Sequence, residues 1–374
     1  MGQAQSVVEW VVTCGGSRDY PEWPAFEAKC RAEGLNEPAI AAFKYNYGQL
    51  ASGANLMMAE SSISAVDSLP SYDALSKEDS SLLSKTVVLK LNGGLGTGMG
   101  LEKAKSLLKL KGNDTFLDFI AKQVMKMRET FGVPLAFMLM NSFSTSKDTL
   151  DALAKYPSLP TAALGGLEFQ QNKAPKVDAA DLSPAAWPAN PSMEWCPPGH
   201  GDLYPALLGS GTLDRLLAQG FKYMFVSNSD NLGATMDLKL LTWFAESRAP
   251  FAMECAQRTD ADKKGGHLCK LGSKLALRES AQCPDEDENA FQDVTKHKYA
   301  SFLSSFSSSC MHADLCNGIL SFLFLLLLHP CSFLFLLRLH PWKLATVCLP
   351  DWWLRALLPC HFSLARSRWL SARH

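Results

Sequence analysis

The chain has 374 residues and a formal net charge of −1, with 36 basic and 37 acidic side chains. This balance offers no electrostatic footprint for nucleic acid or for an anionic membrane surface, so neither is expected as a partner. The eleven cysteines include no Cys-x-x-Cys pair, which argues against a zinc ribbon and predicts reduced thiols in the cytoplasm. The length allows two domains, or one large domain with an appendage.

The amino-terminal segment, residues 1–85, is predicted to be helical. Glycine and proline separate three stretches of helix-compatible composition at residues 27–31, 39–47 and 74–83. A polar, Ser-rich linker is expected over residues 61–70. No group of residues in this segment suggests catalysis.

Two features near the amino terminus bear on localisation. Glu9 interrupts the short apolar run at residues 7–12, so no secretory signal peptide is predicted. Gly2 lies in a Met-Gly-x-x-x-Ser pattern for N-myristoylation, a short pattern that also occurs by chance. Because a single acyl chain binds membranes only marginally, membrane attachment is not expected.

A buried strand followed by a glycine cluster is the most informative stretch. Four of the five residues at 87–91 are β-branched or aliphatic, a short apolar run without polar alternation that is typical of a parallel strand. Residues 93–100 then contain five glycines, namely Gly93, Gly94, Gly96, Gly98 and Gly100. Bare backbone N–H groups at a strand's carboxyl end can approach an anion closely, and Lys105 adds a compact positive charge. The stretch therefore predicts a triphosphate cradle.

The spacing of the glycines excludes the two commonest phosphate loops. No Gly-Lys-Ser/Thr closes a P-loop, and the third position of a Gly-x-Gly-x-x-Gly pattern would be Met99 or Leu101. A glycine-rich surface turn without a ligand is the alternative. It is disfavoured because flexible loops rarely follow such a buried strand directly.

Residues 86–299 alternate between predicted strands and helices. Thr115 is expected to cap a helix that ends before Gly132, with an apolar face made of Phe116, Phe119, Ile120, Val124 and Met127. Strands are predicted at residues 135–140 and 222–226. The alternation indicates a largely parallel α/β sheet with function at the strands' carboxyl ends. The proline-rich residues 174–202 are expected to form a lid or binding loop.

The carboxyl-terminal residues 300–374 differ abruptly in composition. They contain two acidic residues and four of the nine tryptophans, and residues 321–331 and 332–342 form a tandem repeat. The apolar run at 319–328 is short of the ~20 residues that span a bilayer. The preferred hypothesis is translated non-coding sequence in an aberrant apolar tail. A membrane-attached hairpin is the alternative.

Four motifs occur in an order that resembles a known family. They are LKLNGGLGTGMG (residues 89–100), PPGHGD (197–202), SNSDNLGA (227–234) and KGG (264–266). Together they are similar to the eukaryotic UTP–glucose-1-phosphate uridylyltransferases, also called UDP-glucose pyrophosphorylases. The resemblance covers roughly residues 25–299 and implies a Rossmann-like α/β nucleotidyltransferase core, with a mostly parallel mixed sheet between helices.

The resemblance also implies the site. The positions implied for the nucleotide are Leu91, Gly93, Gly94, Gln171 and Gly199. Those implied for the sugar phosphate and hexose are His200, Asn228, Gly266 and Glu286. Lys105 and Asp230 are implied as catalytic, with Lys105 on the triphosphate and Asp230 as the Mg²⁺ ligand. The implied substrates are UTP and glucose 1-phosphate.

The chemistry of nucleotidyl transfer suits these residue types. An incoming phosphate oxygen attacks the α-phosphorus in line, so positioning and charge neutralisation suffice without a protein nucleophile. Simpler interpretations remain open: Asn228 and Asp230 as turn formers, His200 as a turn residue between two glycines, and Glu286 as part of a solvated acidic run.

The departures from the family pattern leave the activity of this chain open. The expected Asn-rich strand after Tyr299 and a carboxyl-terminal left-handed β-helix domain are absent from the sequence, and Asp287 stands where histidine is common. Losing that strand predicts an unpaired sheet edge. The predicted divisions are residues 1–85, an incomplete catalytic core at 86–299 and the tail at 300–374. A broad-specificity UDP-sugar pyrophosphorylase and a non-catalytic nucleotide-binding remnant remain as alternatives.

Overall fold

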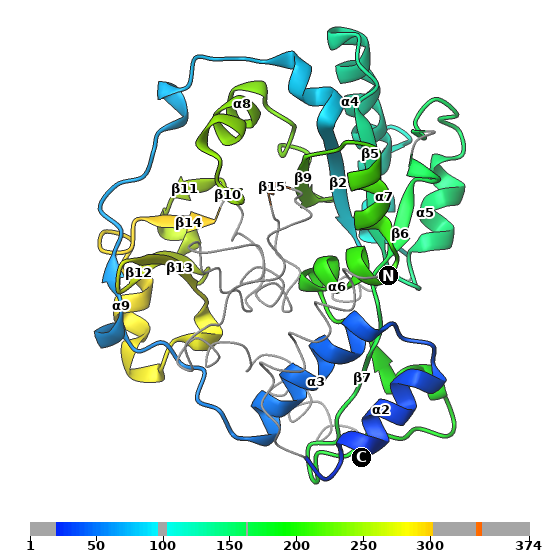
Figure 1. Ribbon diagram of the computed structural model, residues 1–374. Coiled ribbons are helices and arrows are strands. Elements are labelled where there is room, and N and C mark those ends of the chain that lie inside the picture. The colour runs from blue at the N-terminus through cyan, green and yellow to red at the C-terminus, as the bar shows by residue number, and fades with distance from the viewer. Residues whose placement is uncertain (1–19, 96–102, 162–163, 302–333, 339–374) are drawn as a thin grey trace.

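The computed structural model describes residues 20–95, 103–161, 164–301 and 334–338 (Figure 1). The expectations about Gly2, about Gly96, Gly98 and Gly100, and about most of the tail lie outside these residues.

An aromatic helical hairpin begins the described chain. Helices α2 (Trp23–Ala32) and α3 (Glu37–Ala51) confirm the helices expected at residues 27–31 and 39–47. Asn36 caps α3, because its side-chain oxygen accepts a hydrogen bond from the Ala39 N–H at 3.0 Å. The two helices pack through the rings of Trp23, Phe26, Phe43 and Tyr47.

The segment between α3 and the central sheet is not helical over residues 74–83, so that prediction is wrong. Short 3₁₀ turns, η2 (Tyr72–Ala74) and η3 (Ser80–Lys85), occupy the region instead. Asp79 explains the change: its carboxylate accepts from the Ser81 N–H, and its own N–H donates to the Thr242 hydroxyl, both at 2.9 Å. Such bonds compete with helical ones. The segment runs along the outside of the molecule (Figure 1).

A mixed, mostly parallel sheet of six strands forms the centre, as predicted. Its order is β10 (Phe251–Met253), β15 (Leu334–Arg338), β9 (Tyr223–Asn228), β2 (Thr86–Asn92), β5 (Ala136–Asn141) and β6 (Glu168–Gln170). The central pairings, β2 with β5 and β9 and β5 with β6, are parallel.

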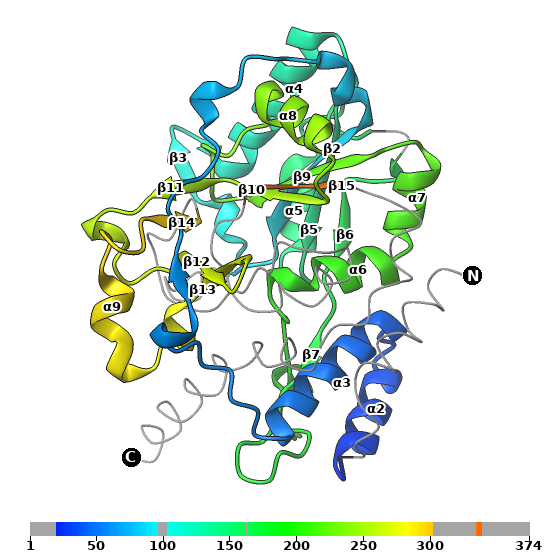
Figure 2. The ribbon, with the colours of Figure 1, turned by 60° about the vertical axis from the view of Figure 1, so that its left-hand side comes forward.

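The sheet edge next to β9 is covered, which corrects the expectation of an unpaired edge. Strand β15 lies antiparallel between β9 and β10, with Leu334 opposite Ser227 and Arg338 opposite Tyr223 (Figure 2). The strand comes from the second copy of the tandem repeat. A segment of the tail thus occupies a position where backbone pairing was expected to be lost.

Helices cover both faces of the sheet and make it a three-layer structure (Figure 2). Helices α6 (Leu203–Gly209) and α7 (Thr212–Ala218) lie on one face. Helices α4 (Phe116–Phe131), α5 (Ser146–Leu153) and α8 (Leu238–Ser247) lie on the other. Strand β2 contributes alternate side chains to the two apolar cores, as the two-residue period of a strand requires.

Helix α4 begins and ends where the sequence indicates. Thr115 and Asp118 form a reciprocal capping box, and Gly132 ends the helix at φ 63°, a conformation that favours glycine. The predicted apolar face is partly wrong. Leu117 and Ala121 are fully buried, whereas Phe116, Phe119 and Met127 are only half-buried.

Smaller elements surround the central sheet. A three-stranded sheet joins β1 (Ser64–Ala65), β12 (His267–Leu271) and β13 (Lys274–Arg278). The two-stranded pairs are β11 (Cys255–Gln257) with β14 (Tyr299–Ser301), β3 (Lys109–Lys111) with β4 (Asp114–Thr115), and β7 (Ala174–Pro175) with β8 (Trp195–Cys196). Strand β1 lies inside residues 61–70, so the expected linker is partly ordered by pairing with β12.

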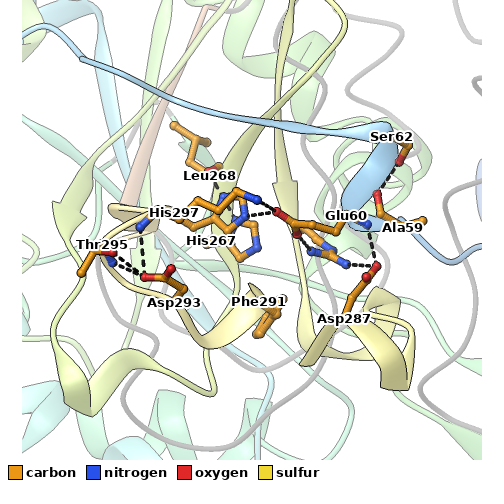
Figure 3. Close-up of polar contacts among 12 residues, drawn as sticks. Ala59, Glu60, Ser62, His267, Leu268, Asp287, Phe291, Asp293, Thr295 and His297 are labelled. Atoms are coloured by element: carbon orange, nitrogen blue, oxygen red, sulfur yellow. Dashed lines mark hydrogen bonds and ion pairs between the residues drawn. The ribbon is translucent and has the colours of Figure 1, made fainter. Parts of the chain in front are cut away.

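An ionic cluster around the buried side chains of Arg278 and His297 joins the segment between α3 and β2 to the region of strands β12 to β14 (Figure 3). The Glu60 carboxylate accepts from Arg278 Nη1 at 2.6 Å, Lys296 Nζ at 2.7 Å and His297 Nε2 at 2.8 Å. Arg278 also contacts Asp287 Oδ2 at 3.2 Å. The partners of Glu60 are more than 200 residues away in sequence, so no local pattern could predict them.

This cluster predicts an acid-sensitive stability. Burial raises the pKa of Glu60, but the hydrogen bonds from Lys296 and His297 outweigh it and lower the pKa from 4.5 to about 2. A carboxyl with a lowered folded-state pKa contributes stability above pH 4.5 that is lost as the pH falls toward 2. Glu60→Gln is expected to lower the free energy of unfolding at pH 7 by about 3 kcal/mol.

Urea unfolding from pH 7 to pH 2.5 would measure this effect. Glu246→Gln is the matched control, because Glu246 pairs with Lys77 at 2.9 Å on the surface and such pairs contribute little. Equal losses of stability in the two variants would contradict the assignment.

Candidate active site

Lys105 and Asp230 form an ion pair at the edge of the central sheet. The Lys105 Nζ lies 2.6 Å from Asp230 Oδ2, although the residues are 125 positions apart. Both side chains remain accessible, with exposed fractions of 43% and 22%. The structure therefore brings together the two residues that the sequence singled out for phosphate and metal chemistry.

The parallel pairing of β2 and β9 explains this meeting. Leu91 lies opposite Asn228, so the glycine stretch and the turn that holds Asp230 leave the same edge of the sheet. The Ser229 N–H donates to the Leu91 carbonyl at 3.0 Å, which joins the two strand ends. Leu91 itself belongs to the apolar core on one face of the sheet, with an exposed fraction of 3%.

A buried lysine forms a hydrogen bond with the backbone of the turn after β9. Lys90, 2% exposed, donates from Nζ to the Ala234 carbonyl at 2.8 Å. Burial lowers the pKa of Lys90 to about 7, against the opposing effect of the Asp230 charge. Gln123 Nε2 donates to the Leu232 carbonyl at 3.0 Å from helix α4. These bonds fix the turn that carries Asp230. Sequence reasoning missed Lys90, whose signal is a charged residue inside an apolar strand.

Asn92 links the surrounding segments at the end of β2. Its Nδ2 donates to Asn141 Oδ1 at 2.7 Å and to Thr149 Oγ1 at 2.9 Å. Its Oδ1 accepts from the hydroxyls of Ser106 and Ser229 at 2.5 Å and 2.8 Å. The two serines directly adjoin the members of the ion pair. Asn92 was also missed, and its only signal is an amide at the end of a buried strand.

Gln171 lies against the glycine stretch. A Cβ added to Gly93 would come within 2.3 Å of Gln171 Nε2, so the approach depends on glycine. Gln171 is 5% exposed, and its Oε1 has no hydrogen-bond partner among the described residues. A buried amide oxygen without a partner is costly, and a ligand donor would satisfy it.

The remaining predicted nucleotide and sugar-phosphate residues differ in accessibility. Gly94 is exposed, and its carbonyl accepts from the Lys105 N–H at 3.3 Å. Gly199 has φ 100°, which favours glycine, and precedes the buried His200 in the 3₁₀ turn η8 (His200–Asp202). Asn228 is 3% exposed, and its Oδ1 finds no hydrogen-bond partner within the described ranges. That oxygen is suited to accept from a ligand hydroxyl.

The two residues predicted to contact the hexose lie next to strands β12 and β13, outside the central sheet. Gly266 precedes β12, and a Cβ there would lie 2.6 Å from the Glu279 carboxylate. Glu286 is exposed in the 3₁₀ turn η11 (Asp285–Asp287). In the part of the chain that the structure describes, neither has a hydrogen bond to Lys105 or Asp230. Their contact with a sugar stays a prediction.

Asp230 is a single carboxylate rather than part of a cluster. Within the described ranges, no group of three or more His, Cys, Asp or Glu side chains could hold a metal ion. Mg²⁺ in nucleotide sites is commonly held by one or two carboxylates together with substrate phosphates and water. The donor set therefore fits a metal that arrives with a nucleotide.

Among the residues that the structure describes, no helix is both long and apolar enough to cross a membrane.

A glycine-rich strand end beside a lysine–aspartate pair, at the carboxyl edge of a parallel sheet, is the arrangement typical of Rossmann-like α/β proteins that bind nucleotides. The sequence model of the UTP–glucose-1-phosphate uridylyltransferases matches residues 41–302. The chain belongs to this family of nucleotidyltransferases.

Named relatives and solved structures agree with this membership. The uridylyltransferase of Solanum tuberosum is 44% identical over 222 residues, which cover 59% of this chain and 46% of the relative. The uridylyltransferase of Saccharomyces cerevisiae is 40% identical over 233 residues, which cover 62% of this chain and 46% of that relative. A Leishmania major UDP-glucose pyrophosphorylase variant, solved with UDP-glucose, superposes with a TM-score of 0.72 at 45% identity, covering 76% of this chain and 62% of that one. The chain spans about half the length of the curated relatives it matches.

Proposed function

We propose that the protein transfers the uridylyl group of UTP to glucose 1-phosphate, giving UDP-glucose and pyrophosphate. The observation that carries the proposal is the 2.6 Å approach of Lys105 to Asp230 beside the glycine stretch. Family membership supports the substrate class, and the Leishmania major pyrophosphorylase variant is itself in complex with UDP-glucose.

The proposed reaction is one in-line substitution at phosphorus. A phosphate oxygen of glucose 1-phosphate forms a bond to the α-phosphorus of UTP, and the bond from that phosphorus to the bridging oxygen breaks. Pyrophosphate leaves with the electron pair, so the enzyme supplies no nucleophile. Lys105 is proposed to neutralise charge on the triphosphate, while the backbone of the glycine stretch holds the nucleoside and Gln171 reads the edge of the uracil base.

Mg²⁺ is the proposed metal, with Asp230 as its protein ligand. A hard oxygen donor of this kind suits Mg²⁺, and the bound ion would supply charge neutralisation on the phosphates. Free thiols at Cys30, Cys196, Cys255 and Cys283 support a cytoplasmic location for the reaction.

Pyrophosphate release from UTP and glucose 1-phosphate tests the proposal. Release that depends on both substrates would support it. A chain that binds UTP but releases no pyrophosphate would be a nucleotide-binding remnant, and the proposal would fail. Galactose 1-phosphate in place of the glucose ester would reveal a broader UDP-sugar pyrophosphorylase.

The contact between Gly93 and Gln171 provides a matched pair of variants. Gly93→Ala forces Gln171 to move, so we expect KM for UTP to rise about tenfold. Gly233→Ala meets only Asn231 Oδ1, at an ordinary contact distance of 3.6 Å, and should leave KM for UTP near the wild-type value. Steady-state kinetics with varied UTP would measure both. The same KM in the two variants would remove Gln171 from the nucleotide site.

A further inference from the structure

Asp202 is a buried carboxylate with an unusual set of partners. It is 2% exposed and has no ion pair in the described part of the chain. Its Oδ1 accepts from Asn172 Nδ2 at 3.0 Å, and its Oδ2 accepts from both Nδ2 and the backbone N–H of the same asparagine. Asp202 also holds the N-cap position of α6 without making a side-chain cap bond there. Both oxygens of its carboxylate therefore accept hydrogen bonds from Asn172.

Burying this carboxylate without a cation is costly. Burial raises the pKa of Asp202 to about 7, although the hydrogen bonds from Asn172 oppose that shift. An ionised side chain kept from water normally finds an opposite charge, because amide donors repay only part of its lost hydration. The arrangement therefore calls for an explanation other than stability.

The partners of Asp202 continue into the amino-terminal hairpin. Asn36 Nδ2 donates to Asn172 Oδ1 at 2.7 Å, while the Asn36 oxygen caps α3. Asn36 also fits against the end of α6, where a Cβ on Gly209 would lie 2.1 Å from its Cγ. Asn36, Asn172 and Asp202, here called the asparagine–aspartate network, thus join three segments that are remote in sequence.

The position of the network suggests its role. Asn172 directly follows Gln171, the proposed base-reading residue, and Asp202 ends the turn that contains His200, the proposed sugar-phosphate residue. We propose that Asp202 is a positioning residue, which locks the segment bearing Gln171 onto the turn bearing Gly199 and His200. Asn36 holds this unit against α3. The inference rests on the proposed function and deepens it, because it assigns uracil selectivity to residues that do not touch the base.

Uracil selectivity gives a readout that a purely structural role would not move. A fall in the folded fraction weakens UTP and CTP binding equally, whereas a displaced Gln171 loses its preference for one base edge. Asp202→Asn places an amide donor against the donors of Asn172, and we expect the ratio of CTP to UTP dissociation constants to fall about tenfold. Calorimetry on the full chain, with each nucleotide separately, measures the ratio.

Three further variants sharpen the test. The double variant Asn172→Asp with Asp202→Asn exchanges the two side chains, so that an amide donor again faces a carboxylate acceptor. It should restore the wild-type ratio of CTP to UTP dissociation constants. Asp181→Asn is the control, because that exposed carboxylate lies outside the asparagine–aspartate network and accepts hydrogen bonds from Ser183 in the same long loop. Asn36→Ser keeps a capping hydroxyl but loses the donor to Asn172, so a fall of about threefold is expected. If the Asp202→Asn variant does not fold, the Asn36→Ser variant alone tests the positioning role of the network.

The outcomes separate the two proposals. A wild-type chain that prefers UTP, with Asp202→Asn or Asn36→Ser variants of unchanged preference, would overturn the positioning role alone. A wild-type chain that binds neither nucleotide would overturn the proposed function and the positioning role together.

Discussion

Replacing Lys105 by alanine is expected to lower kcat/KM for UTP by about 10²- to 10³-fold. The Lys105 ammonium lies 2.6 Å from the Asp230 carboxylate, at the edge where the glycine stretch leaves β2. Charge on the triphosphate and the leaving pyrophosphate would lose a fixed cation. The loss should fall mainly on kcat, because charge on the leaving group grows toward the transition state.

Lys103 provides the matched control for this variant. It lies two residues earlier and is exposed, and it makes no hydrogen bond or ion pair within the described ranges. Lys103→Ala should retain nearly full activity. Pyrophosphate release at saturating glucose 1-phosphate would measure both variants, and an equal decrease would show that only the general positive charge of the loop matters.

Replacing Asp230 by asparagine is expected to lower kcat by a similar factor, about 10²- to 10³-fold. The amide keeps the shape of the side chain and its bond to Lys105, but it removes the negative charge proposed to hold Mg²⁺. The concentration of Mg²⁺ at half-maximal rate should rise together with the loss of rate. A titration of activity against Mg²⁺ would show both effects.

Asp214→Asn is the control for the charge change, since Asp214 is exposed on α7. A normal Mg²⁺ dependence in Asp230→Asn would remove this residue from the metal site. Because Lys105 and Asp230 touch, their losses should be less than additive in the double variant.

The elements that the sequence predicted are those specified by neighbouring residues. Strand β2 is an apolar run, and α4 has its cap at Thr115 and its terminating glycine at Gly132. The sequence also predicted function at the carboxyl ends of the strands, where Lys105 and Asp230 lie, because parallel strands bring these ends to one edge. For these features, local composition and the topology of α/β sheets contain the needed information.

The features that were missed depend on partners far away in sequence. Glu60 lies just before the predicted polar linker, and only the folded chain shows that it contacts Arg278 and His297. The helix expected at residues 74–83 failed because Asp79 bonds to Thr242 on α8, a contact that no periodicity reveals.

The residues of the site that were missed also depend on partners far away in sequence. Asn92 and the asparagine–aspartate network use amides and a carboxylate at strand ends and turns, where these residue types are common for ordinary reasons. Only the folded chain separates an Asn that bridges four segments from one that shapes a turn. Strand β15 was missed for another reason: its repeated Leu and Phe residues suggested no register, whereas pairing with β9 and β10 supplies one.

The most direct measurement is pyrophosphate release by this chain from UTP, glucose 1-phosphate and Mg²⁺, compared with the Lys105→Ala variant. Our account predicts release that requires both substrates and the metal, with formation of an equal amount of UDP-glucose and near-complete loss in the variant. Binding of UTP without any release of pyrophosphate would contradict it.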